Sequence, residues 1–331
     1  MFTTHTLGQT ADLNNITNSQ QTAKTDLLTL HAGSLLKQVA FNHRLFGLMA
    51  VSSAKTISAK WYDSCTYYES FRPDVTLTPS LNPQELFNQI IQVKKADYDV
   101  KAAILGPISL MKTLSFESEA LGLQYLTRLL PLYSQLLVRL GQLKLPWVQF
   151  DEPMLTQSLD KHIRHAYRSS YFGLQRAPVK IMVSAGFGSL KQNLQLACQL
   201  PVQALHVDCL EPNQMMRVVD WLPRHKILSL GVINGQDLAK SDLMGLLTHL
   251  KPIAERLKKR LWLAPNVSFV HLSVEESTSN ALHNPFVLQK IRELNSLAQA
   301  LKDGEFTQPI RLFRSNPIEN NFEKDPNSKV A

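Results

Sequence analysis

The segment Trp147-Val148-Gln149-Phe150-Asp151-Glu152-Pro153 contains the pattern that decides the fold. Its first five residues form a mostly apolar run of strand length, and two carboxylates and a proline end it. Similar runs recur along the chain, and longer amphipathic stretches separate them; they cover residues 102–106, 179–183, 204–208, 227–232 and 261–264. This alternation is typical of repeated βα units around a parallel sheet whose strands are covered on both faces.

The stretches between the runs show helical periodicity. Residues 121–143 carry apolar side chains three and four positions apart, which predicts a helix that packs outside the sheet. Asn82-Pro83 places a capping residue before a proline at the first helical position, so a second helix is expected from there to about Lys95. Residues 243–257 and 286–301 predict two more helices.

Six strands are clear, and two earlier ones are needed to close an eight-stranded barrel. The candidates are Phe2–Leu7 and the region just before Lys60. We therefore predict an α/β protein with one domain, a (β/α)8 TIM barrel over residues 1–312. Residues 9–23, rich in Asn, Gln and Thr, are expected to form a mobile loop, and residues 313–331 a disordered tail.

Composition narrows the class of protein. The chain has 331 residues, 44% of them hydrophobic, and a formal charge of +8. No apolar run is long enough to span a membrane and no signal peptide is evident, so we expect a cytoplasmic protein without a membrane partner. The basic charge suits nucleic acid, an anionic membrane surface or a polyanionic small molecule, but no nucleic-acid-binding motif accompanies it. The cysteines Cys65, Cys198 and Cys209 are too scattered for a disulfide framework and are expected to be reduced.

Candidate catalytic residues follow the strands, because barrel active sites lie at the carboxyl ends of the strands. Asp151 and Glu152 could bind a cation or an amino group, or act as acid and base, although Asp151 could equally cap the next helix. His206 and Asp208 alternate along one strand, so their side chains point to the same side. They could instead be a hydrogen-bonded core pair.

Other polar residues near strand ends carry weaker signals. Asn234, before Gly235, could reach a substrate at the barrel mouth or simply make a turn. Asn266 and His271 follow the last run, and a structural role is expected for His271. The segment that holds His206, Cys209 and Glu211 lacks the further ligands that zinc needs, so no metal site is predicted. Dinucleotide, Walker and serine-hydrolase motifs are absent, which leaves nucleotide cofactors without support.

Several short motifs occur together in one order along the chain. They are His5-Thr6-Leu7-Gly8, Lys60-Trp61-Tyr62-Asp63, Leu105-Gly106-Pro107, Trp147 to Pro153, Leu205 to Asp208, Gly231 to Gly235 and Leu261-Trp262-Leu263. Through these motifs the chain resembles the N-terminal domain of cobalamin-independent methionine synthase. Members of that family transfer a methyl group from methyltetrahydrofolate polyglutamate to homocysteine.

The resemblance implies a ligand and a partner. In the family two barrels face each other; the C-terminal one holds zinc and homocysteine, and the N-terminal one helps to hold the glutamate tail of the folate. The tail contact maps onto Lys60, whose ammonium suits a glutamyl carboxylate, and Asp151 and Asn234 are further substrate-binding candidates. A second, basic tail contact of the family is replaced here by the neutral segment Ile16-Thr17-Asn18-Ser19.

The zinc ligands of the catalytic barrel have no counterparts in this chain. They would align with Val183-Ser184-Ala185, the vicinity of Asp208, and Val267. We therefore expect no cofactor in this chain and no methionine synthesis by it alone, because zinc activates the homocysteine thiol. The expected function is a methyltransferase component that binds the folate and works with a separate zinc-bearing barrel. A non-catalytic scaffold or binding barrel, and an independent TIM-barrel enzyme acting on another small molecule, remain as alternatives.

Overall fold

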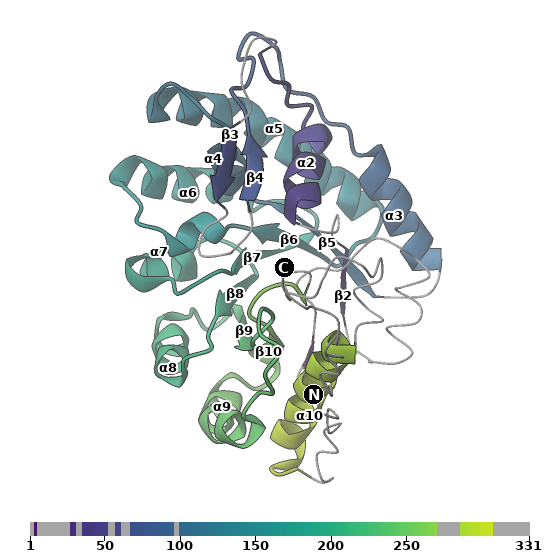
Figure 1. Ribbon diagram of the computed structural model, residues 1–331, viewed down its shortest axis with the longest axis vertical. Coiled ribbons are helices and arrows are strands. Elements are labelled where there is room, and N and C mark those ends of the chain that lie inside the picture. The colour runs from purple at the N-terminus through teal and green to yellow at the C-terminus, as the bar shows by residue number, and fades with distance from the viewer. Residues whose placement is uncertain are drawn as a thin grey trace, which may run out of the picture.

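The computed structural model describes residues 3–4, 27–30, 35–51, 57–60, 67–95, 99–269 and 285–306. Within these residues eight strands form one curled sheet in the order β1-β10-β9-β8-β7-β6-β5-β2 (Figure 1), and every hydrogen-bonded pair is parallel. The strands are β1 (Thr3–Thr4), β2 (Leu28–Leu30), β5 (Val100–Leu105), β6 (Trp147–Asp151), β7 (Lys180–Ala185), β8 (Ala204–Asp208), β9 (Ile227–Ile233) and β10 (Leu261–Pro265). The predicted α/β class and the six clear strands are confirmed.

One backbone hydrogen bond joins the two ends of this strand order. The Leu27 N–H, just before β2, donates to the Thr4 carbonyl of β1 at 3.3 Å. The curl of the sheet thus brings its first and last strands near each other.

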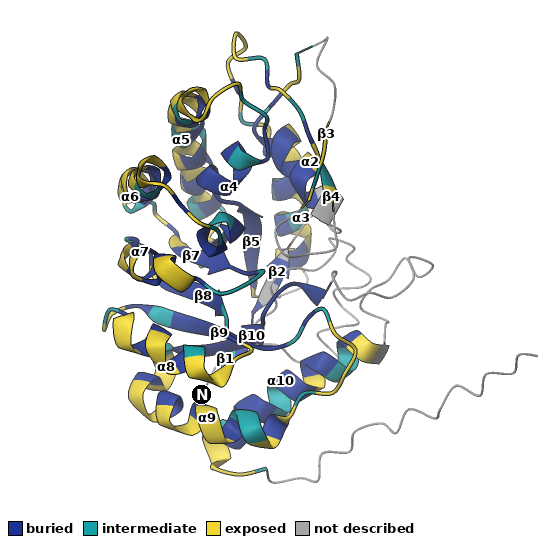
Figure 2. Ribbon diagram, turned by 60° about the vertical axis from the view of Figure 1, so that its left-hand side comes forward, coloured by how far each residue is buried: buried dark blue, intermediate teal, exposed yellow. Residues whose placement is uncertain are grey.

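The helices cover the outside of the sheet. They are α2 (Leu35–Leu45), α3 (Gln84–Lys95), α4 (Pro107–Lys112), α5 (Glu119–Gln142), α6 (Lys161–Leu174), α7 (Leu194–Gln199), α8 (Pro212–Trp221), α9 (Leu243–Leu257) and α10 (Pro285–Asp303), with short 3-10 turns η1 (Pro153–Thr156), η2 (Lys191–Asn193) and η3 (Lys258–Arg260). The four predicted helices, α3, α5, α9 and α10, are confirmed. Figure 2 shows that each long helix buries one face and exposes the other. No helix among the described residues is long and apolar enough to cross a membrane.

Helix starts follow the capping residues. The Asp160 carboxylate accepts hydrogen bonds from the His162 and Ile163 amides at 2.6 and 3.0 Å and so begins α6. Ser118 caps α5 by accepting from the Leu121 amide at 3.3 Å. Each bond satisfies an amide that the first helical turn would leave without a partner.

The second strand of the parallel sheet was predicted at the wrong place. The region before Lys60 is a strand, β3 (Ile57–Lys60), but it pairs antiparallel with β4 (Tyr67–Ser70) in a separate two-stranded sheet. Its side chains are mostly exposed, Ile57 to 55%, so β3 lacks the burial of a strand covered on both faces. The position in the parallel sheet is taken by β2, whose sequence is Leu28-Thr29-Leu30.

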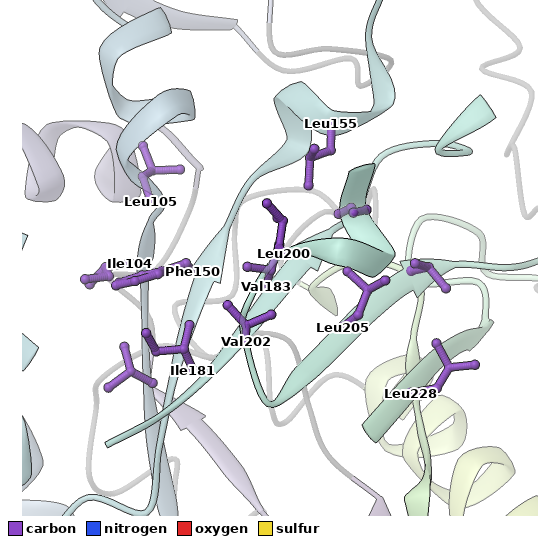
Figure 3. Close-up of a cluster of buried hydrophobic side chains, with 14 of the residues drawn as sticks. Ile104, Leu105, Phe150, Leu155, Ile181, Val183, Leu200, Val202, Leu205 and Leu228 are labelled. Atoms are coloured by element: carbon purple, nitrogen blue, oxygen red, sulfur yellow. The ribbon is translucent and has the colours of Figure 1, made fainter. Parts of the chain in front are cut away.

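The hydrophobic core has two parts. Figure 3 shows the larger part, in which strand residues such as Ile104, Phe150 and Ile181 belong to one buried cluster that also contains helix residues. The second cluster consists of Leu27, Trp147, Met182, Ala204 and Trp262, residues that alternate with the first set along the strands and therefore lie on the inner face of the sheet. Trp147 and Trp262 meet edge to face there, with ring centroids 5.1 Å apart. Predictions for residues 5–26, 61–63, 271 and 313–331 lie outside the described residues.

Candidate functional site

A chain of polar side chains runs along β5 and β6 on the inner face of the sheet. Lys101 is fully buried, and its Nζ donates to Gln149 Oε1. Gln149 Nε2 in turn donates to Asp151 Oδ1 at 2.6 Å, and Gln38 Nε2 of α2 donates to Asp151 Oδ2 at 3.0 Å. Asp151 therefore lies at the carboxyl end of β6 with both oxygens engaged.

Burial changes the pKa of Lys101. Removal from water lowers the pKa of the Lys101 ammonium to about 7, and the nearby Asp151 charge opposes that shift. Sequence reasoning singled out Asp151 but missed Lys101, Gln149 and Gln38. The period of two along a strand offered a signal, because Gln149 shares the face of Asp151.

A second polar group lies on β8, β9 and the segment after β10. His206 is fully buried; its Nδ1 is 2.8 Å from Ser229 Oγ and its Nε2 is 3.3 Å from the Asn266 carbonyl. Asn266 Nδ2 donates to Asp208 Oδ2 at 3.2 Å, so Asn266 links the two residues predicted from this strand. Burial lowers the pKa of His206 to about 3 and raises that of Asp208. His206 is therefore neutral at pH 7, and both of its nitrogens already have neighbours.

Glu152 lies apart from these groups. Adjacent strand residues point to opposite faces, so Glu152 enters the helix layer while Asp151 faces the interior. Its carboxylate accepts from the Ile108 and Ser109 amides of α4 at 3.2 and 2.9 Å, and from the Tyr167 and Tyr171 hydroxyls at 3.0 Å each. Burial raises the pKa of Glu152 to about 7, and these hydrogen bonds oppose the shift.

The predicted substrate-binding residues Lys60 and Asn234 occupy different parts of the molecule. Lys60 is exposed at the end of β3 and pairs with Tyr67 across the hairpin. Asn234 follows β9, where its Oδ1 accepts from the Gln236 amide at 2.9 Å, as in a turn. The structure thus joins His206 and Asp208 through Asn266 but shows no contact of Lys60 or Asn234 with Asp151 among the described residues.

A small hollow lies at the carboxyl end of β8. Its lining includes Asp208 together with Lys191 and Arg217 from the segments on either side. This hollow has no counterpart among the sequence predictions, apart from Asp208 itself.

Thiols and metal ligands are dispersed. Burial raises the pKa of Cys198 to about 11 and that of Cys209 to about 12, so both are neutral thiols at pH 7. Within the described ranges, no three His, Cys, Asp or Glu side chains converge as a metal site requires.

Comparison with known proteins assigns the family. Residues 49–258 match the family described as cobalamin-independent synthase, N-terminal domain. A 5-methyltetrahydropteroyltriglutamate–homocysteine methyltransferase of Saccharophagus degradans is 38% identical over 258 residues, which are 74% of this chain and 33% of that protein. The chain thus spans about a third of the length of this relative.

Two solved structures share the fold at low sequence identity. A B12-independent methionine synthase from Shewanella, in complex with selenomethionine, superposes with a TM-score of 0.65 at 15% identity and covers 88% of this chain and 87% of its own. A methyltransferase from Methanosarcina mazei gives a TM-score of 0.60 at 10% identity and covers 86% and 83%. On the strength of the family match and the 38% identical relative, this chain belongs to the cobalamin-independent methionine synthase family, in the part that corresponds to the N-terminal domain.

Proposed function

We propose that this chain is a methionine-synthase-related methyltransferase component, which binds the glutamate tail of methyltetrahydrofolate and works with a separate zinc-bearing barrel. The proposal starts from the family match and from the name of the S. degradans relative, which is a folate-dependent homocysteine methyltransferase. The proposal includes a closed barrel. It is supported by the hydrogen bond from the Leu27 amide to the Thr4 carbonyl, which joins the two edges of the sheet. A single domain over residues 1–312 and a cytoplasmic location belong to the same proposal.

The exposed position of Lys60 is the observation that carries the proposal. Its hairpin packs against α2 and α4 (Figure 1): the Tyr68 hydroxyl donates to the Lys112 carbonyl at 3.4 Å, and the Ser115 amide donates to the Phe71 carbonyl at 2.9 Å. Because α4 begins directly after β5 ends, the hairpin lies at the carboxyl side of the parallel strands. Barrel ligands bind on that side. A solvent-accessible ammonium there can pair with a flexible, polyanionic tail.

A non-catalytic binding barrel is the second candidate. The polar groups inside the sheet are already hydrogen-bonded to one another, as in the contacts of Asp151 with Gln38 and Gln149. His206 is buried and neutral, which makes it a poor acid or base at pH 7. These contacts favour binding over independent catalysis by the four predicted catalytic residues.

The test is the affinity of Lys60 variants for methyltetrahydrofolate with one and with three glutamates. Lys60→Ala should weaken triglutamate binding by about 1–3 kcal/mol, the range for a charge-assisted contact, and monoglutamate binding much less. Lys60→Arg should lose less than Lys60→Ala. Titration calorimetry at two ionic strengths measures this, and the difference should shrink in high salt because an exposed ion pair is screened.

Lys251→Ala is the matched control, because it removes another exposed lysine, on α9, far from the hairpin. Equal triglutamate affinities of the wild type and Lys60→Ala, or no binding by either, would remove the folate proposal and leave the non-catalytic barrel. A loss of triglutamate affinity in Lys60→Ala but not in Lys251→Ala would support binding of the glutamate tail at Lys60.

A further inference from the structure

The loops that lead into the later strands of the parallel sheet carry an unbalanced positive charge. They connect a helix to β6, β7, β8, β9 and β10 in turn, and they cover residues 143–146, 175–179, 200–203, 222–226 and 258–260. These loops contain no aspartate or glutamate, whereas four of them contain lysine or arginine. Because each loop precedes a parallel strand, all of them lie at the amino ends of the strands, on the side opposite to the proposed folate site.

Six exposed cations of these loops and of the first residue of β7 form what we call the basic face. They are Lys144, Arg176, Lys180, Arg224, Lys258 and Lys259. Among the described residues, none of the six has an ion pair with a carboxylate. Asp220, in the last turn of α8, pairs with Arg256 at 2.6 Å, so its charge is already balanced.

The segments that leave the same strands differ in charge. At the carboxyl ends, the exposed carboxylates of Asp160, Glu211 and Asp237 occur together with the cations Lys191 and Lys240. Charges of both signs are thus mixed on that side. The unbalanced positive charge is a property of the amino ends alone among these loops.

Stabilisation of helix ends does not account for all of these cations. A lysine or arginine interacts with a helix dipole only within about the last turn. Arg224 lies beyond the end of α8 at Trp221, and Lys180 already belongs to β7. Lys180 Nζ lies 5.4 Å from the centroid of the Trp147 ring, at the amino end of the sheet interior. The basic face therefore extends across this end of the sheet.

An exposed tryptophan accompanies the cations. Trp221 ends α8 just before Arg224, and 51% of its surface is accessible. Tryptophan is enriched at membrane–water interfaces because its ring is amphipathic. A lysine or arginine near an anionic lipid surface contributes about fivefold to affinity. Cations from four separate loops, spread over one end of the sheet, suit a broad array of anionic headgroups better than they suit one small anion.

We propose that the basic face binds the surface of a membrane that contains anionic phospholipids. The lipid phosphates lie against the lysines and arginines, and Trp221 enters the interface between headgroups and acyl chains. Such binding is peripheral and needs no spanning segment, so the lack of a long apolar run in the sequence does not bear on it. The carboxyl ends of the strands stay accessible, and the proposal does not depend on folate binding at Lys60.

Sedimentation of the full chain with lipid vesicles tests the proposal. One set of vesicles contains phosphatidylcholine alone, and the other contains phosphatidylcholine and phosphatidylglycerol. The protein should bind only the anionic vesicles, and binding should weaken as salt is added because exposed charges are screened. These measurements use the unmodified protein, so they do not depend on the folding of a variant.

Two charge-matched variants locate the binding surface. Lys258→Glu/Lys259→Glu changes the basic face, and Lys161→Glu/Lys191→Glu changes the carboxyl side by the same net charge. Each pair includes one residue with positive φ, Lys258 at 53° and Lys191 at 45°, so backbone strain is matched as well. The first variant should bind anionic vesicles at least about 25-fold more weakly than the wild type, at about fivefold for each cation. The second should bind as the wild type does.

Trp221→Ala separates the apolar contact from the charges. It should weaken binding to anionic vesicles at low and at high salt, because the burial of an aromatic ring is not screened. Absence of wild-type binding to anionic vesicles, equal binding to both kinds of vesicle, or equal losses in the two double variants would overturn the proposal. Tighter binding to a short RNA or to poly-L-glutamate than to anionic vesicles would assign the basic face to another polyanion and overturn it as well.

Discussion

Asp151 and Glu152 are neighbours in the chain, and the strand directs their side chains to opposite faces of the sheet. Asp151 joins Gln38 and Gln149 in the interior, whereas Glu152 binds the first amides of α4 and two tyrosine hydroxyls. A carboxylate at a helix N-terminus satisfies amides that would otherwise lack partners. Glu152 therefore connects β6, α4 and α6 and stabilises their packing.

Glu152→Gln should change how stability depends on pH. The folded state raises the pKa of Glu152 from 4.5 to about 7, so between these values the folded protein holds a proton that the unfolded chain releases. Stability from this group is therefore fully present below pH 4.5 and falls as pH rises to 7, by about 2–4 kcal/mol. The substituted side chain does not titrate. As the pH rises from 4.5 to 7, the free energy of unfolding of Glu152→Gln should therefore increase relative to that of the wild type.

Denaturant unfolding at pH 5 and pH 7.5 measures this difference. The variant has to be compared with the wild type because two buried histidines also titrate. Burial lowers the pKa of His43 to about 4 and that of His206 to about 3, so both make the folded state less stable as the pH falls. This contribution is the same in both proteins and cancels in the difference. Glu255→Gln on the exposed face of α9 is the control and should keep the wild-type profile. A Glu152→Gln profile parallel to the wild type would show that Glu152 keeps an ordinary acidity.

The candidate residues of the site could be predicted only where they end a strand. Asp151, His206 and Asp208 are polar residues at or near the ends of apolar runs, and the period of two placed His206 and Asp208 on one side. Lys101 is the second residue of β5, where a lysine gives no local sign that it will be buried. Arg217 and Lys191 line one hollow only because α8 packs beside the β7–α7 loop, which no local pattern encodes.

At the scale of elements, the close approach of α4 to β6 depends on Gly106. A Cβ at this position would lie 2.2 Å from Glu152 Oε1, and α4 begins at the next residue, Pro107. Gly173, near the end of α6, is the opposite case, because a Cβ there would meet nothing within 4 Å. Alanine at the two positions therefore tests two different effects: a steric clash at Gly106, and only the backbone preference of the helix at Gly173.

Gly173→Ala should stabilise the protein by about 0.5–1 kcal/mol, because alanine favours the helix and restricts the unfolded chain. Gly106→Ala should destabilise it by at least about 1 kcal/mol, because Glu152 must move from its buried bonds. Thermal or denaturant unfolding of both variants measures the contrast. If both alanines changed stability equally, the tight contact between Gly106 and Glu152 would not limit the fold.

The long periodic helices and the six apolar strand runs were predicted correctly, whereas the short strand β2 was missed. The helices α5 and α9 have several turns of apolar periodicity, which makes their sequences unambiguous. The strand β2 has only three residues, Leu28-Thr29-Leu30, and its place in the sheet comes from pairing with β5. The more visible candidate before Lys60 pairs locally with β4 instead, because its exposed side chains suit a two-stranded hairpin outside the core.

At the scale of the whole molecule, the inner face of the sheet changes character along the strands. An apolar layer of Leu27, Trp147, Met182, Ala204 and Trp262 lies toward the amino ends, and the polar groups around Asp151 and His206 follow toward the carboxyl ends. The apolar layer fills the interior, as in a packed barrel. Asp151 and Asp208, at the carboxyl ends of β6 and β8, place polar groups at the end of the sheet where the proposed folate and partner would meet it.

This chain spans about a third of the length of its S. degradans relative, so the activity expected of it alone differs from that of a complete synthase. By the resemblance, the family's zinc ligands would align with Val183-Ser184-Ala185, the vicinity of Asp208, and Val267. The first and last of these positions supply neither a thiolate nor an imidazole. Purified protein should therefore contain less than about one-tenth equivalent of zinc. It should transfer no methyl group from methyltetrahydrofolate triglutamate to homocysteine, because the thiol lacks the metal that would lower its pKa.

Metal analysis and a methyl-transfer assay check this together, with the full-length S. degradans relative as the active control. A version of that relative without the third that matches this chain provides a possible partner barrel. Under the proposal, adding this chain to the shortened relative should raise methyl transfer above that of either protein alone, and Lys60→Ala should reduce the gain. Stoichiometric zinc that a chelator removes from this chain, or methyl transfer by it alone, would mean that ligands outside the aligned positions build a metal site here.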